Sequence, residues 1–349
     1  MPATQAERQE RQERQERRED TATFLETHRR EIERAAQNIA PYTRRTPTLT
    51  TDLAENLLLK PECFQVTGSF KARGAFNAIL NLKRRQPDVK GVIAVSSGNH
   101  AQALALAART AQIPALILIP HDANPQKIAA TRAYGAEVIT DNVTFANREQ
   151  RLRETMAERG YTLVHPFDDW DIIHGQGTAA LELLAQAGAE KQPTVIATPC
   201  GGGGLLTGTA LAAKSSNPGI KVFGVEPETA DDARQTFETG TLQTLSTSPE
   251  TIADGVRSTA VGKKTFEVMV ERRLVDGIVT VSEDEIKDAV RAAWTRTKLA
   301  LEPTGVLPLA AYLAGKLPPP EPPGTTTALI LSGGNANLAL IAEILAAPL

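Results

Sequence analysis

The stretch VIAVSSGNH at residues 92–100 joins a short apolar segment to a helix-forming run that begins at Ala101. Its first four residues have the length and β-branched character of a buried strand, and its loop is rich in turn-forming residues. The same strand–loop–helix order recurs along the chain, with further strands predicted at 57–59, 115–119, 137–139, 194–197, 222–225 and 328–331. Strands that alternate with helices indicate an α/β fold, in which helices cover parallel sheets.

Composition excludes several classes of function. The chain has 349 residues, of which 41% are hydrophobic and 23% charged, and this balance is typical of a globular protein. No apolar run approaches the length needed to cross a bilayer. Lys and Arg number 38 against 41 Asp and Glu, and the net charge of -3 provides no strong field for nucleic acid or an anionic membrane. We therefore expect small-molecule chemistry.

The two cysteines, Cys63 and Cys200, have no CxxC partner and no zinc-like spacing with the five histidines. They fit a reducing compartment, and the N-terminus lacks the apolar core of a secretory signal, so we expect a cytoplasmic protein. Residues 1–20 are expected to form a charged tail, either disordered or helical. Thr23 and Glu26 form a possible capping box for the first core-forming helix, which should end before Pro41.

Lys71 ends the loop TGSFK at residues 67–71 and stands at the start of a predicted helix. A lysine at a helix start is usually a solvated charge. The partial positive charge of a helix N-terminus nevertheless disfavours protonated lysine, which helps to keep an amine nucleophilic for Schiff-base chemistry.

Three more loops stand between a predicted strand and a helix. Residues 96–100 place hydroxyls, an amide and free N–H groups where a carboxylate could be held. The four glycines at 201–204 indicate a phosphate site, because they let the backbone and a helix N-terminus approach the anion. Glu226 at the end of the next strand leaves a dinucleotide site open as an alternative. Ser332 begins the turn SGGN, which by itself indicates only a helix cap.

These loops, taken in order, resemble the fold-type II pyridoxal-phosphate enzymes, above all the serine/threonine dehydratases and serine racemases. The likeness runs from about Thr46 to the C-terminus. It rests on the stretches FQVTGSFKARGAFNA, SSGNHAQAL, GAEVI, HPFDD, HGQGTAALELL, CGGGGL, TIADGVRS and LSGGNANL. The resemblance favours a pyridoxal-phosphate site over the dinucleotide alternative, and it implies two parallel-sheet α/β lobes with the cofactor in the cleft between them.

The resemblance assigns roles to individual residues. Lys71 becomes the Schiff-base lysine and the base at the substrate Cα. The other implied cofactor-binding residues are Phe70 against the ring, Asn99 at the phenolic oxygen, Ser332 at the pyridine nitrogen, Gly255, and Gly201, Gly202, Gly203 and Gly204 at the phosphate. The implied substrate-binding residues are Ser96, Ser97, Gly98, Asn99 and His100.

A serine beside the pyridine nitrogen cannot keep that nitrogen protonated as an aspartate would, and the weaker electron sink favours β-elimination over transamination. The resemblance thus implies a threonine/serine dehydratase that converts L-threonine to 2-oxobutanoate and L-serine to pyruvate, with release of ammonia. Ser97 leaves serine racemisation open, since racemases have serine there and many threonine dehydratases have alanine. HPFDD at 165–169 looks more like the dehydratases, and threo-3-hydroxyaspartate is a further candidate substrate.

The racemase-like branch also implies a metal site, at which Glu226, Asp232 and the carbonyl of Ala230 would bind Mg²⁺ or Ca²⁺. An acidic loop that caps a helix is the alternative. The resemblance further implies a homodimer and, because the chain ends fourteen residues after Asn335, no isoleucine-binding regulatory domain. We expect a large cofactor-binding domain from residues 21–82 and 170–349, and a small domain from 83–169.

Overall fold

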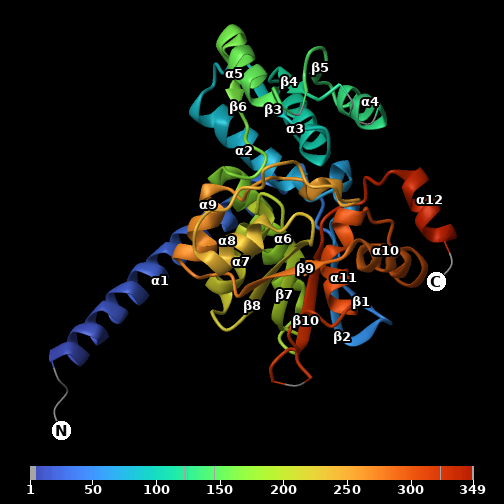
Figure 1. Ribbon diagram of the computed structural model, residues 1–349. Coiled ribbons are helices and arrows are strands. Elements are labelled where there is room, and N and C mark those ends of the chain that lie inside the picture. Colours follow the sequence, from blue (N-terminus) through green and yellow to red (C-terminus); the bar gives the residue numbers. More distant parts are fainter. Residues whose placement is uncertain (1–4, 122, 124, 145, 323, 348–349) are drawn as a thin grey trace.

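The computed structural model describes residues 5–347 except 122, 124, 145 and 323. The chain forms two separate β-sheets (Figure 1). The six strands of the larger sheet are, in spatial order, β1 (Leu49–Thr51), β2 (Ala54–Pro61), β10 (Thr326–Leu331), β7 (Pro193–Pro199), β8 (Lys221–Pro227) and β9 (Gly277–Val281). The smaller sheet has the order β5 (Glu137–Ile139), β4 (Ala115–Leu118), β3 (Val92–Val95) and β6 (Thr162–Leu163).

Among the residues that the structure describes, every strand pairing is parallel except that of β1 with β2, which is antiparallel at the edge of the larger sheet. The predicted α/β class with parallel-sheet lobes is therefore confirmed. All seven predicted strands are present, with ends that differ by up to three residues. In the described part of the chain, no helix is both long and apolar enough to cross a membrane.

Helices cover both sheets. They are α1 (Gln5–Ile39), α2 (Lys71–Arg85), α3 (Asn99–Thr110), α4 (Pro125–Ala133), α5 (Arg148–Arg159), α6 (Trp170–Ala187), α7 (Gly204–Ser216), α8 (Asp232–Thr239), α9 (Lys263–Phe266), α10 (Glu283–Ala292), α11 (Leu307–Leu313) and α12 (Leu338–Ala346). Short helical segments are η1 (Glu62–Phe64), η2 (Val66–Gly68), η3 (Asp254–Val256), η4 (Glu267–Glu271), η5 (Ala293–Thr297) and η6 (Pro303–Val306).

The inner strands of the larger sheet are apolar on both faces, and helices cover both faces. In β10, Leu329 and Leu331 pack with residues of α10 and α11, whereas Ala328 and Ile330 pack with residues of α6 and α7. The smaller sheet has the same design, since Ile93 of β3 packs toward α5 and its neighbours Val92 and Ala94 pack toward α2 and α3. Burial on both faces explains why these strands are continuous apolar runs.

Helix α1 corrects one prediction. The helix is continuous from Gln5 to Ile39, so it does not begin at Thr23. The Thr23 hydroxyl donates to the carbonyl of Glu19, four residues earlier, at 3.0 Å. The capping box is therefore wrong, although the helix does end before Pro41. The N-terminal part of α1 extends away from the body of the molecule (Figure 1).

Candidate functional site

Three of the loops singled out in the sequence contact one another. The N–H of Phe70 donates to the carbonyl of Ser332 at 3.0 Å, and the N–H of Gly334 donates to the carbonyl of Gly68 at 2.9 Å. The side-chain amide of Asn335 donates to Oδ1 of Asn99 at 2.7 Å. The loops after β3 and β10 thus lie at the start of α2, as expected for sites at the carboxyl ends of parallel strands.

Lys71 is the first residue of α2. Its Nζ donates to the carbonyl of Pro166 at 2.9 Å and lies 5.1 Å from the centroid of the Phe70 ring. Burial lowers the pKa of this amine from 10.5 to about 8. Among the described residues no carboxylate pairs with the ammonium form, so Lys71 is the kind of amine that can act as a nucleophile near neutral pH.

Asn99 is held from two sides. Its Oδ1 accepts from Asn335, and its Nδ2 donates to Oε1 of Glu302 at 2.7 Å. Glu302 is buried, and burial, followed by the charge of Asp254, raises the pKa of this carboxyl to about 7. Neither partner of Asn99 was predicted from the sequence. Asn335 lies within a quoted motif and could have been found there, whereas nothing in the local pattern marks Glu302.

The loop at 96–100 presents two kinds of group. Ser97 is exposed, and no atom of the described residues lies within 4 Å of a Cβ built on Gly98, so the loop has open space beside it. His100 is buried, with Nε2 3.1 Å from the carbonyl of Val164. Burial, and then the charge of Lys71, lowers the pKa of His100 to about 3, so its imidazole is neutral. His100 therefore offers a carboxylate its backbone N–H at the start of α3, and not a charged ring.

The glycine loop stands at the N-terminus of α7. Within the described part of the chain, the N–H groups of Gly201, Gly202 and Gly203 donate to no protein acceptor. A Cβ on Gly202 would lie 2.3 Å from Cγ of Phe167, and Gly203 has a φ of +86°. Side chains are thus excluded, and the free N–H groups at a helix N-terminus suit a phosphate.

The remaining predicted cofactor residues lie beside these loops. Val256 of η3 is the nearest neighbour of a Cβ built on Gly201, and the adjacent Gly255 donates its N–H to Oγ1 of Thr304 at 2.9 Å. Ser332 is buried, and the contact between its carbonyl and Phe70 places it at the start of α2. Pro166, which accepts from Lys71, is next to the Phe167 ring that packs against the glycine loop.

Glu226 and Asp232 form a pair of buried carboxyl groups. Glu226 accepts from the N–H groups of Arg234 at 2.8 Å and Ala233 at 3.3 Å, whereas Oδ2 of Asp232 is buried without a partner among the described residues. Burial, and then the charge of Asp232, raises the pKa of Glu226 well above its usual range. Burial of Cys200, followed by the charge of Glu226, raises the pKa of the Cys200 thiol. The two carboxyl groups therefore lie close to Cys200, which directly precedes the glycine loop.

Comparison with known proteins agrees with this arrangement. The family model described as "Pyridoxal-phosphate dependent enzyme" matches residues 39–333. The chain is 43% identical to L-threo-3-hydroxyaspartate ammonia-lyase of Saccharomyces cerevisiae, over 89% of this chain and 94% of that protein. It is 41% identical to serine racemase of Dictyostelium discoideum, over 90% and 97% of the two chains. The crystal structure of the T.th. threonine deaminase superposes with a TM-score of 0.81 at 50% identity, and the match covers 88% of this chain and 98% of that one.

The chain therefore belongs to the pyridoxal-phosphate dependent enzymes, in their fold-type II class. Within that class it belongs with the ammonia-lyases and serine racemases. The resemblance seen in the sequence is confirmed, and the dinucleotide alternative is wrong. The Glu226 carboxylate accepts hydrogen bonds from two backbone N–H groups of α8, which agrees with this conclusion.

The residues present fit pyridoxal phosphate. The cofactor needs an amine for its aldehyde, hydrogen-bond donors for its phosphate and a polar partner for its phenolic oxygen. Lys71, the free N–H groups of the glycine loop and the Asn99 amide are groups of these three kinds, and open space lies beside Gly98.

Proposed function

We propose that this enzyme eliminates the β-hydroxyl group of β-hydroxy amino acids, and converts L-threonine to 2-oxobutanoate and L-serine to pyruvate with release of ammonia. The observation that carries the proposal is the Lys71 amine, whose lowered pKa suits both a Schiff base and removal of the Cα proton. The cofactor, when bound, would supply the electron sink that makes this proton acidic.

The roles of the residues follow from their positions. Lys71 would hold the cofactor and serve as the base, and Phe70 would lie against the cofactor ring. Asn99 and Ser332 would orient the ring, and Gly255 would lie beside it. The N–H groups of residues 201–204 would hold the phosphate. The hydroxyls of Ser96 and Ser97 and the N–H groups at the start of α3, including those of Asn99 and His100, would hold the substrate carboxylate.

Serine racemisation is the second candidate. Its supporting observation is the exposed side chain of Ser97 in the carboxylate loop, together with relatives that are named serine racemases. Racemisation needs an acid/base group on each face of Cα, and Ser97 would act opposite Lys71. The Ser97→Ala variant should then lose D-serine formation and keep 2-oxo acid formation. The ammonia-lyase relatives also support L-threo-3-hydroxyaspartate as a substrate.

A divalent cation is the third part of the proposal. Two buried carboxyl groups, one with an oxygen that lacks a partner among the described residues, form an oxygen-rich environment suited to Mg²⁺ or Ca²⁺. Glu226, Asp232 and the carbonyl of Ala230 would be its ligands, and its role would be structural. The family resemblance further supports a homodimer, with a small domain at residues 83–169 and a large domain at 21–82 and 170–349. The free cysteines Cys63 and Cys200 fit a location in the cytoplasm.

The test of the catalytic assignment is the Lys71→Ala variant, with Lys83→Ala at the other end of α2 as its matched control. After reduction with borohydride, the cofactor should be fixed to the peptide that contains Lys71 in wild type and in Lys83→Ala. Lys71→Ala should have no fixed cofactor and nearly no turnover. Cofactor fixed to a different lysine in wild type would refute the assignment.

A further inference from the structure

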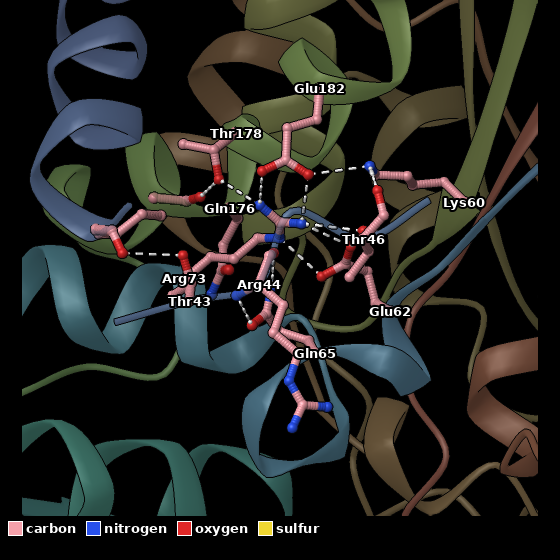
Figure 2. Close-up of polar contacts among 12 residues, drawn as sticks. Thr43, Arg44, Thr46, Lys60, Glu62, Gln65, Arg73, Gln176, Thr178 and Glu182 are labelled. Carbon is pink, nitrogen blue, oxygen red and sulfur yellow. Dashed lines mark hydrogen bonds and ion pairs between the residues drawn. The ribbon is translucent and has the colours of Figure 1, made fainter. Parts of the chain in front are cut away.

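A group of charged side chains is buried behind the first turn of α2. Arg73, Glu62 and Lys60 have 0% of their side chains exposed, and Glu182 has 19%. We call these four residues the Arg73 cluster. They come from four elements, α2, η1, β2 and α6, and Figure 2 shows the Arg73 guanidinium between the two carboxylates.

Arg73 makes two forked ion pairs. Its Nε and Nη2 donate to the two oxygens of Glu62 at 2.7 and 2.9 Å. Its Nη1 and Nη2 donate to the two oxygens of Glu182, both at 2.9 Å. The hydroxyls of Thr46 and Thr178 accept further hydrogen bonds from the guanidinium, each at 3.2 Å. Every nitrogen of the guanidinium therefore has an acceptor, and a lysine could not reproduce this planar fork.

Stability alone is a poor explanation for this cluster. Burial of charges costs free energy that their mutual attraction often fails to return, and apolar residues of similar size can stabilise a core as well or better. A planar, doubly forked arginine does provide fixed geometry, because each fork restricts both the direction and the rotation of the side chain. The cluster thus restrains the backbone from which Arg73 projects.

That backbone is the one that carries Lys71. The N–H of Arg73 donates to the carbonyl of Phe70 at 3.0 Å, and a Cβ on Gly175 of α6 would lie only 2.6 Å from the carbonyl oxygen of Arg73. The N–H of Gly74 donates to Oε1 of Gln176 at 3.2 Å. Residues two apart on a helix point about 200° apart, so Lys71 projects away from the side on which Arg73 is held.

We propose that Arg73 is a positioning residue for Lys71, which fixes the first turn of α2 so that the amine reaches the cofactor and the substrate Cα in productive geometry. This inference rests on the assignment of Lys71 as the cofactor lysine. Misplacement of a catalytic group by about 1 Å can cost roughly a hundredfold in rate, so a precise anchor behind Lys71 has a direct catalytic use.

The test compares Arg73→Lys with Lys60→Met. Lys60 belongs to the same cluster and donates to Glu182 at 3.0 Å, but it lies on β2 and not on α2. Three quantities are measured for each variant: Tm, kcat and KM with L-threonine, and the pH midpoint for capture of pyridoxal phosphate by the cofactor-free protein. Arg73→Lys should lower kcat by about 10- to 100-fold with little change in KM. Arg73→Lys should also raise the pH midpoint for cofactor capture, because a displaced Lys71 would be less buried and its pKa would be lowered less.

Lys60→Met should lower Tm but keep the wild-type kcat and capture midpoint. The proposal is overturned if Arg73→Lys retains the wild-type kcat and the wild-type pH midpoint for cofactor capture. It is also overturned if Lys60→Met changes both quantities as strongly as Arg73→Lys does, because the cluster would then act through overall stability. If Arg73→Lys does not fold, Glu182→Gln replaces it, and smaller changes in the same direction are expected. If the wild-type protein captures no cofactor at Lys71, the assignment of Lys71 as the cofactor lysine is refuted instead.

Discussion

At the scale of the residue, the proposed chemistry depends on one amine that is neutral more often than a solvated lysine. With its pKa at about 8, Lys71 is about half neutral at pH 8, whereas an unshifted lysine would be neutral in roughly 1 molecule in 300. Burial causes this shift. The glycine loop and the N–H groups of α3 add anion sites without adding a negative charge beside the amine.

This pKa predicts how cofactor capture depends on pH. The neutral amine is the nucleophile, so the rate at which cofactor-free protein captures pyridoxal phosphate should rise with pH, pass its midpoint near 8 and then level off. Below pH 8 the ammonium form predominates and capture should slow about tenfold per pH unit. Rapid-mixing absorbance measurements would give the profile. A midpoint near 10.5 would mean that Lys71 is solvated.

Candidate site residues could be predicted from the sequence where they belong to a recognisable motif. Lys71, Asn99 and the four glycines could be predicted as candidate site residues because each stands at a strand-to-helix junction or a helix start. Glu302 was missed because its role arises from a contact across 203 positions of sequence, with Asn99. Arg73 was missed as well, since its partners Glu62 and Glu182 come from distant segments and its position in α2 looks like an ordinary surface arginine.

At the scale of the element, the strands were predicted best where helices cover both of their faces. The strands that were missed are β1, β6 and β9, which lie at sheet edges. Strand β6 has two residues, and β9 has only one fully buried residue, Val281, so neither presents a long apolar run. The start of α1 was misplaced because the Thr23 hydroxyl bonds back to Glu19 within a continuous helix.

The glycine loop gives a test at this scale. In Gly202→Ala, the new Cβ would meet Phe167 at 2.3 Å, so the loop must move, at a cost of about 1–3 kcal/mol for overpacking. The matched control is Gly219→Ala, whose nearest neighbour is the movable Asn217 side chain at 3.1 Å. Absorbance titration should show weaker cofactor binding for Gly202→Ala alone. Equal binding by both variants would contradict a phosphate role for this loop.

At the scale of the whole molecule, side chains from the two lobes meet beside the site. Lys127 of α4, beside the smaller sheet, pairs with Asp254 of η3, beside the glycine loop. Both side chains influence the carboxyl group of Glu302, which holds Asn99. Side chains from both lobes thus lie close to Glu302. The strand–helix alternation predicted the α/β class and the family resemblance implied the two lobes, but side-chain contacts between the lobes depend on the folded arrangement.

The proposed cation also acts at this scale, because a ligand that binds the folded state alone stabilises it. Mg²⁺ at about a hundred times its Kd should add about 2.7 kcal/mol to the free energy of unfolding. Scanning calorimetry should show a rise in Tm with Mg²⁺ for wild type, and none for Asp232→Asn. Asp231→Asn is the control, because the Asp231 carboxylate already accepts from Gln235 and pairs with Arg234. An unchanged response of Asp232→Asn would exclude this site.

The most direct test of the central claim is the product formed by cofactor-loaded enzyme from L-threonine, L-serine and L-threo-3-hydroxyaspartate, with 2-oxo acid and D-amino acid measured in parallel. We predict that 2-oxo acid and ammonia form in equal amounts from L-threonine or L-serine, and faster than any D-amino acid. D-serine formed faster than pyruvate would contradict the assignment of elimination as the main reaction and would identify the enzyme as a racemase.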